Sequence, residues 1–231
     1  LEAAAERRAL LKEPSYRDWF RKQWTSLFLP KVFHRDFKQS QIVACPDASL
    51  IGRSFADLAK ERGTDAVSVF LDLNAEHGDQ LRWRTQIGND RPHAVKEILS
   101  HPDAQPGFAD SGAHLKNMSF YNFPLHLLRL AHRDGFMSIE RAVHRLTGEI
   151  ADWYRVDTGH LKPGAHADVA IIDPAQLNDS IDAFHDGAMP EFGGWTRLVR
   201  RNAETVPWVV VNGRVAMERG EARDVGHGRF M

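Results

Sequence analysis

The sequence has a single cysteine, Cys45, so no disulfide can form within the chain. This scarcity is typical of proteins in a reducing compartment, and we expect a cytoplasmic location. No run approaches the roughly 18 apolar residues that a membrane-spanning helix needs, and no apolar stretch typical of a signal peptide follows the charged N-terminal residues. We therefore expect no membrane partner.

An excess of either charge is also missing. The chain carries 30 Lys and Arg residues against 31 Asp and Glu residues, which gives a formal net charge of −1. This balance offers no electrostatic basis for nucleic-acid binding. The cluster of Arg197, Arg200 and Arg201 is local, and we interpret it as a solvated face.

Complete cofactor motifs are absent as well. The sequence contains no His-x-His, His-Glu-x-x-His or Cys-x-x-Cys motif, and no glycine-rich nucleotide loop. Because a tetrahedral zinc site needs three or four ligands at defined distances, no local segment supplies such a site.

What is present is a pattern of strands and helices that is typical of a globular α/β protein. The alternation favours βα units and a parallel sheet, with Ser54, Thr64 and Ser138 as helix N-caps. Helices are expected over residues 3–12, 16–28, 52–63, 64–78, 91–103, 122–135 and 138–155. Aromatic side chains at Tyr16, Trp19, Phe20 and Trp24 are expected to face a core. Strands are expected at 42–45, 81–90, within 106–114, and at 169–172, 209–211 and 214–217.

After residue 160 the sequence pattern becomes typical of β structure. The strand at 169–172 is expected to be buried, and residues 175–205 are expected to form a long loop. Asn212-Gly213 predicts a type I′ hairpin turn.

The segment "GFADSGAHLKN", residues 107–117, carries the main candidate for chemistry. Asp110 is expected at the carboxyl end of a parallel strand, where α/β folds place their active sites, and Gly112 keeps the following turn small. A carboxylate there can ligate a metal or transfer a proton. From the residues alone, Asp110 as a helix cap and His114 as a turn histidine stay open. The other helical histidines are interpreted as surface or packing residues, namely His126, His132 and His144.

The ordered set of motifs resembles the C-terminal half of the amidohydrolase superfamily, in particular the N-acyl-D-amino-acid deacylases, or D-aminoacylases. An Asp-small-Gly-Ala-His motif is followed by the helical A-V-x-x-x-T pattern at Ala142, Val143 and Thr147. The G-x-L-x-x-G-x-x-A-D motif follows at Gly159, Leu161, Gly164, Ala167 and Asp168, and the V-N-G hairpin at residues 211–213. The resemblance runs from about residue 100 to 219 and is looser from 15 to 100. Ala109 stands where the family more usually has Ser.

This resemblance implies an α/β fold: the C-terminal part of a (β/α)8 TIM barrel plus the returning strands of a small β-sandwich. The barrel units are assigned to residues 1–160 and the sandwich strands to 161–231, with a long loop at about 175–205 that covers or shapes the site. The implied reaction is metal-dependent hydrolysis of the amide of an N-acyl amino acid, with Zn²⁺ as the cofactor. Asp110 would be the acid/base and a candidate metal ligand, while Ser111, Gly112 and His114 would contact substrate.

The family's other metal ligands, on earlier barrel strands, have no counterpart in the sequence. A complete barrel takes about 250 residues, more than the 231 available here. We therefore expect an incomplete enzyme that requires its N-terminal half or a second chain for activity, and whether it forms a homo-oligomer stays open. Two alternatives are a cyclic-amide hydrolase related to hydantoinases and dihydroorotases, and a non-catalytic partner chain that completes another barrel.

Overall fold

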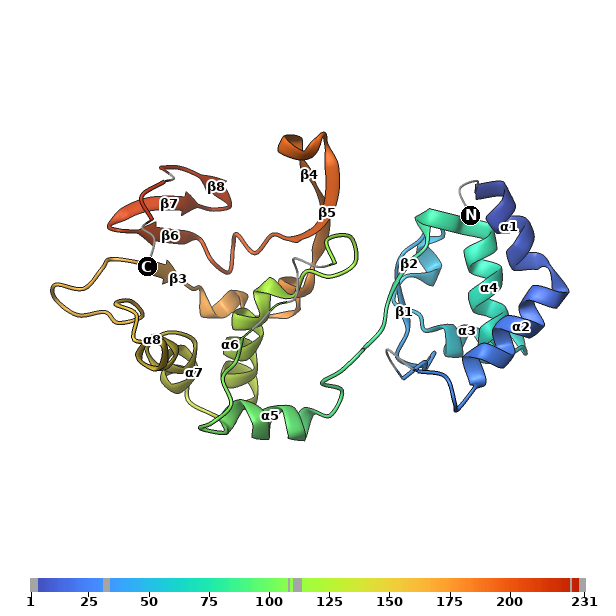
Figure 1. The fold of residues 1–231 in the computed structure, drawn as a ribbon, viewed down its shortest axis with the longest axis horizontal. Helices are drawn as coiled ribbons and strands as arrows, with labels where there is room; N and C mark the ends of the chain where they lie inside the picture. The colour runs from blue at the N-terminus through green and yellow to red at the C-terminus, as the bar shows by residue number, and fades with distance from the viewer. Residues whose placement is uncertain (1–3, 31–33, 108, 110–113, 225, 229–231) are drawn as a thin grey trace. The chain divides into compact units, whose positions relative to one another are not determined.

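The computed structural model describes residues 4–30, 34–107, 109, 114–224 and 226–228. The chain divides into two compact units, Leu1–Val95 and Lys96–Met231, and the boundary falls within helix α5 (Pro92–Ser100) (Figure 1). The structure is mixed α/β, with helices and antiparallel sheets. The assignment of residues 1–160 to a barrel and 161–231 to a sandwich stays a prediction.

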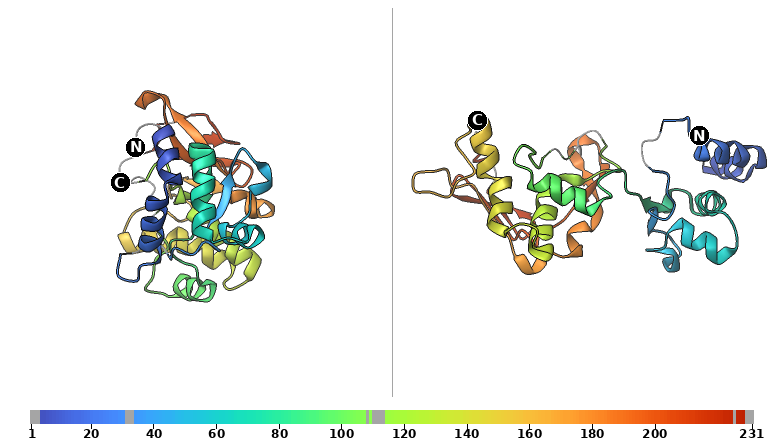
Figure 2. Two further views of the ribbon diagram at one scale, coloured as in Figure 1. Left: turned by 90° about the vertical axis from the view of Figure 1, so that its right-hand side faces the viewer. Right: turned by 90° about the horizontal axis from the view of Figure 1, so that it is seen from below.

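The helices of the first unit agree closely with the predicted ones. They are α1 (Ala4–Lys12), α2 (Pro14–Thr25), α3 (Phe55–Arg62) and α4 (Ala66–His77), with short 3-10 helices at Ala48–Leu50 and Gly78–Gln80. Helices α1 and α2 lie alongside α4 (Figure 2, left). Pro14 starts α2 directly after α1 because proline lacks an N–H and fits the first helical position.

Side-chain caps fix the starts of α3 and α4. The Ser54 hydroxyl accepts the Asp57 N–H at 3.0 Å, which confirms Ser54 as an N-cap. The prediction for Thr64 is wrong, since the Asp65 carboxylate accepts the Ser68 N–H at 3.0 Å and is the N-cap of α4. A carboxylate at this position also interacts favourably with the positive end of the helix dipole.

The strands of the first unit form an antiparallel pair, contrary to the expected parallel arrangement. Strand β1 (Gln41–Ala44) pairs with β2 (Arg82–Arg84), with Ile42 opposite Trp83. No parallel pair occurs among the strands of the described residues. In this unit the alternation therefore predicted the order of the elements, although β2 covers only Arg82–Arg84 of the strand expected at 81–90, and it did not predict their pairing.

Aromatic rings fill the core of this unit. Phe55 is completely buried and meets Phe37, Phe70 and Trp83 at centroid distances of 5.2–6.0 Å. Of the predicted aromatic face on α2, the side chains of Tyr16, Phe20 and Trp24 pack against this core. Trp19 does not, because 54% of its surface stays exposed.

In the second unit, α6 (Phe123–Asp134) and α7 (Ile139–Leu146) pack against each other over Leu125, Leu128 and Ala142. Ser138 is confirmed as the N-cap of α7, since its hydroxyl accepts the Arg141 N–H at 3.1 Å. The predicted helix over 138–155 is divided at Thr147, where the backbone leaves the helical region, and continues as α8 (Gly148–Tyr154).

The β structure of the second unit forms two separate sheets (Figures 1 and 2). One is four-stranded in the order β3-β6-β7-β8 and the other is the β4–β5 hairpin; the strands are β3 (Val169–Ile171), β4 (Phe184–Met189), β5 (Trp195–Arg200), β6 (Trp208–Val211), β7 (Arg214–Glu218) and β8 (Glu221–Ala222). The type I′ turn is confirmed, since Asn212 and Gly213 both have positive φ, 50° and 79°. The remaining short 3-10 helices are Phe120–Asn122, Pro174–Gln176, Asp179–Asp182 and Pro190–Phe192.

Two predictions about the β structure need correction. Strand β3 lies at a sheet edge and Ile171 is 48% exposed, so the strand is not buried. The predicted loop at 175–205 contains the β4–β5 hairpin. The strand expected within 106–114 stays a prediction, because residues 108 and 110–113, including Asp110, Ser111 and Gly112, lie outside the described residues. None of the helices in the described ranges is long and apolar enough to cross a membrane.

Candidate active site

The described part of the motif segment forms a turn that begins at His114. The His114 side chain is exposed, and its carbonyl oxygen accepts the N–H groups of Asn117 and Met118 at 3.2 and 2.9 Å. His114 therefore lies in a turn, while the alternative that its side chain bonds to a backbone carbonyl stays a prediction. Its predicted contact with substrate stays a prediction, as do the roles of Asp110, Ser111 and Gly112.

The residues of this turn are attached to the β4–β5 hairpin. The Leu198 N–H of β5 donates to the Leu115 carbonyl at 2.8 Å. The Lys116 ammonium lies 5.3 Å from the centre of the Trp195 ring, within the range of a cation–π contact. The segment 175–205 thus contacts the downstream end of the motif, while its role in covering or shaping the site stays a prediction.

The upstream side of the motif is held by a buried arginine. Arg145 on α7 is completely buried, and its guanidinium donates through Nη2 to the Ala104 carbonyl. Its Nη1 lies 3.1 Å from Glu149 Oε1 on α8, and the other carboxylate oxygen of Glu149 pairs with Arg141 at 2.6 Å. Arg145 thereby links the α7–α8 pair to the chain that leads into the motif.

The family motifs contact one another in pairs. Gly159 has φ +76°, and a Cβ there would lie 2.9 Å from the carbonyl carbon and oxygen of Thr147. The Asp168 carboxylate accepts the Asn212 N–H at 2.7 Å, and the Gly213 N–H donates to the Ala167 carbonyl at 2.9 Å. These residues hold distant segments together, so their presence in the motifs has a structural explanation.

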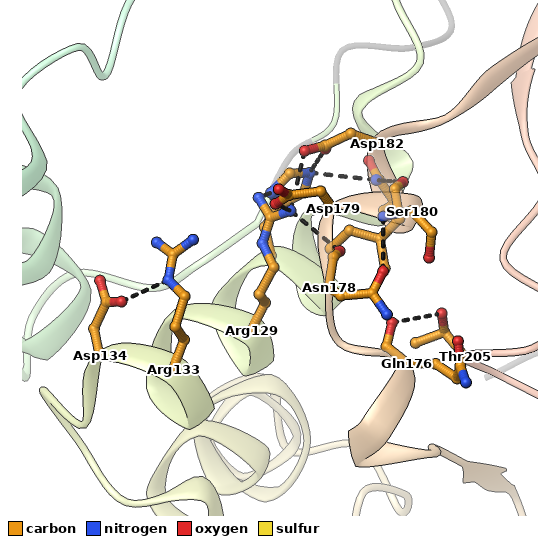
Figure 3. Close-up of polar contacts among 12 residues, drawn as sticks. Arg129, Arg133, Asp134, Gln176, Asn178, Asp179, Ser180, Asp182 and Thr205 are labelled. Carbon is orange, nitrogen blue, oxygen red and sulfur yellow. Dashed lines mark hydrogen bonds and ion pairs between the residues drawn. The ribbon is translucent and has the colours of Figure 1, made fainter.

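A polar network joins α6 to the 3-10 helix Asp179–Asp182 (Figure 3). His126 Nε2 lies 3.0 Å from Asp182 Oδ1, and the Arg129 guanidinium lies 3.0 Å from Asp182 Oδ2 and 3.1 Å from His126 Nδ1. Although partial burial acts in the opposite direction, the hydrogen bonds and charges of His126 and Arg129 hold the pKa of Asp182 well below its usual range.

This network was not foreseen from the sequence, which placed His126 among surface or packing residues. Asp182 lies 56 positions from His126 along the chain, and no local spacing connects them. The Asn122 amide also donates to the Ile181 carbonyl at 2.9 Å, which attaches the start of α6 to the same segment. The carboxylate of Asp182, the ring of His126 and the terminal nitrogens of Arg129 all have protein partners, whereas the buried Nε of Arg129 has none, so the network mainly joins two segments.

The described residues do not fit a metal site. No group of three or more His, Cys, Asp or Glu side chains that could hold a metal ion occurs within the ranges the structure describes. Cys45 is half-buried against the core of the first unit. A zinc site would therefore need at least one ligand from outside the described residues.

Comparison with known proteins identifies similar sequences, while no family model matches the chain. An uncharacterized protein of Mycobacterium tuberculosis (strain H37Rv) is 45% identical over 224 residues, which are 94% of this chain and 36% of that protein. The N-acyl-D-aspartate deacylase of Alcaligenes xylosoxydans xylosoxydans is 29% identical over 139 residues, 58% of this chain and 26% of the enzyme. This chain resembles the N-acyl-D-amino-acid deacylases. The resemblance predicted from the motifs is thereby confirmed.

The similar solved structures include a D-aminoacylase and an N-acyl-D-glutamate deacylase. A crystal structure of D-aminoacylase is 22% identical, with a TM-score of 0.44, over 82% of this chain and 37% of that chain. An N-acyl-D-glutamate deacylase of Bordetella bronchiseptica, crystallised with zinc and a phosphonate inhibitor, is 22% identical, with a TM-score of 0.41, over 78% of this chain and 35% of that chain. The chain thus spans roughly a third of these proteins and of the mycobacterial relative.

Proposed function

We propose that this chain is the C-terminal portion of a metal-dependent amidohydrolase that cleaves the amide of N-acyl-D-amino-acid-like substrates. The observation that carries the proposal is the sequence similarity to an N-acyl-D-aspartate deacylase, together with the ordered family motifs. Because the chain covers only 26% of that enzyme, the activity is assigned to the whole protein. The chain alone is proposed to be inactive.

In this proposal Asp110 is the general acid/base. Its carboxylate takes a proton from the water whose oxygen attacks the amide carbonyl carbon, and it then gives the proton to the leaving nitrogen as the C–N bond breaks. The products are a carboxylic acid and the amine of the free amino acid. Ser111, Gly112 and His114 would contact the substrate beside Asp110.

An amine-release assay on the full-length protein tests the role of Asp110. N-acyl-D-amino acids are compared with their L counterparts, and Asp110→Asn is expected to lower the rate by about 10²–10⁴-fold, as for loss of an acid–base group. Asp103→Asn, an 89% exposed carboxylate in the same region, is the matched control and should keep the wild-type rate. A wild-type rate in the Asp110 variant would remove it from the mechanism.

The metal requirement is proposed for the whole protein, with zinc as the expected ion and with ligands outside the described residues. Dialysis of the full-length protein against a chelator should abolish amide hydrolysis, and added Zn²⁺ should restore it. Activity that survives complete metal removal, verified by elemental analysis, would contradict the requirement.

Two other functions predict different outcomes of the same assay. A relative of hydantoinases or dihydroorotases would prefer cyclic over linear amides. A non-catalytic partner chain, favoured by the lack of a three-ligand cluster among the described residues, would restore another protein's activity without needing Asp110. A cytoplasmic location and a partner supplied by the N-terminal half or by a second chain stay part of the proposal.

A further inference from the structure

A hollow of about 420 Å³ lies on the β4–β5 hairpin of the second unit. Tyr121 lines it together with Gly187, Ala188 and Met189 of β4 and with Arg197, Val199, Arg200 and Arg201 at the end of β5. We name these residues the hairpin hollow. Its size falls within the range of about 300–1,000 Å³ that is typical of small-molecule sites.

Gly187 creates the space on this face. It lies directly opposite Arg197 in the strand register, and directly opposite residues of paired strands share a face. A Cβ at Gly187 would lie 2.9 Å from Val199 Cγ1, closer than side-chain atoms approach. The glycine therefore leaves bare the surface between Arg197 and Val199.

Two arginines of the hollow, Arg197 and Arg201, form no ion pair with a carboxylate among the described residues. Arg197 is half-buried, and its Nε is completely buried without a hydrogen-bond partner. A buried donor without a partner is costly and is satisfied when a ligand supplies an acceptor.

Arg200 differs from its neighbours because it is fixed in place. Its Nε donates to the Ser119 carbonyl at 3.2 Å, and its Nη1 donates to the Asp182 carbonyl. The Tyr121 hydroxyl accepts the Arg200 N–H, which fixes the aromatic ring beside Arg200 in the lining of the hollow. Tyr121 and Arg200 are thus fixed, while the side chains of Arg197 and Arg201 stay available to an incoming group.

We propose that the hairpin hollow binds the carboxylate of a small organic acid. A guanidinium matches the two oxygens of a carboxylate in a bidentate geometry. Met189 and Val199 add apolar surface, which suits a short hydrocarbon arm and a single negative charge better than a bare dianion. The site requires no metal and no turnover, so it stands independently of the proposed hydrolase activity.

Calorimetric titration of the full-length protein with butyrate, with its neutral analogue butyramide and with inorganic phosphate tests the proposal. Butyrate should bind and butyramide should not. Arg197→Met should weaken butyrate binding at least tenfold, the factor expected for losing a charge-assisted hydrogen bond. Arg201→Met should weaken it in the same direction.

Thermal unfolding separates a binding effect from misfolding. Because Arg197 forms no ion pair within the described residues, Arg197→Met should unfold at the wild-type temperature and lose only the upward shift caused by butyrate. Arg214→Met, a 63% exposed arginine on β7, is the matched control and should bind like wild type. Equal binding of butyramide, tighter Arg197-dependent binding of phosphate, or butyrate binding unchanged in Arg197→Met would each overturn the proposal.

Discussion

Replacing Arg145 with methionine is expected to destabilise the second unit strongly. Methionine keeps much of the side-chain volume, so the main change is electrostatic. Removal of one partner from a buried ion pair costs about 3–5 kcal/mol. Glu149 is 18% exposed and keeps Arg141 at 2.6 Å, so we expect the lower end of this range, about 3 kcal/mol.

The Ala104 carbonyl adds to this loss because it no longer receives the Arg145 N–H. Urea unfolding gives the total change in free energy, and hydrogen exchange of the peptide 139–154 reports the second unit specifically. Arg141→Met is the control: its side chain is 43% exposed, and losing a surface pair should cost less than about 1 kcal/mol.

A double variant sharpens the test. Arg145→Met combined with Glu149→Leu removes both charges, so it should lose less stability than the sum of the single variants. If Arg145→Met unfolds at the wild-type urea midpoint, or if Arg141→Met costs as much, then the buried pair does not hold this region together.

The remaining predictions concern two places in the second unit where segments distant in the sequence contact each other, at Asp182 and at Gly159. The pKa of Asp182 is lowered in the folded state, so its stabilising effect is fully present above the unfolded value of 3.8 and is lost as the pH falls below it. The unfolding free energy of Asp182→Asn should therefore be lower than that of the wild type at neutral pH and should approach the wild-type value on acidification. Asp179→Asn, whose side chain is 95% exposed, should show a smaller difference. Gly159→Ala should destabilise by more than the roughly 1–3 kcal/mol of backbone strain alone, since its Cβ would meet Thr147. Gly164→Ala has the same kind of strain at φ +85° but no neighbour within 4 Å, and equal effects of the two in thermal unfolding would refute the contact with Thr147.

Local elements were predictable where the signal is itself local. The Ser54 and Ser138 caps and the Asn212-Gly213 turn depend on residues within a few positions, and all three are confirmed. The error at Thr64 is equally local, because the N-cap of α4 is the next residue, Asp65, whose carboxylate is the stronger cap. Such errors shift a boundary and leave the helix in place.

The pairing of β1 with β2 and the network of His126 with Asp182 were not predictable, because the partners lie far apart in the chain. The β4–β5 hairpin in residues 175–205 lacks the Asn-Gly signal of the last hairpin, and a 3-10 helix connects its strands. Likewise, the cluster of Arg197, Arg200 and Arg201 was interpreted as solvated, yet these residues line a hollow because Gly187 stands across the hairpin. The sequence around Arg197 does not reveal that Gly187, on the paired strand, leaves space beside it.

The edge position of β3 has a practical consequence for handling the protein. The strand pairs only with β6 within the described residues, and its exposed Ile171 adds apolar surface beside the open row of backbone groups. An uncovered edge of this kind accepts a strand from another copy of the chain. Preparations of the chain without a covering partner should therefore self-associate as the concentration rises, and a lysine in place of Ile171 is the change that would keep them dispersed.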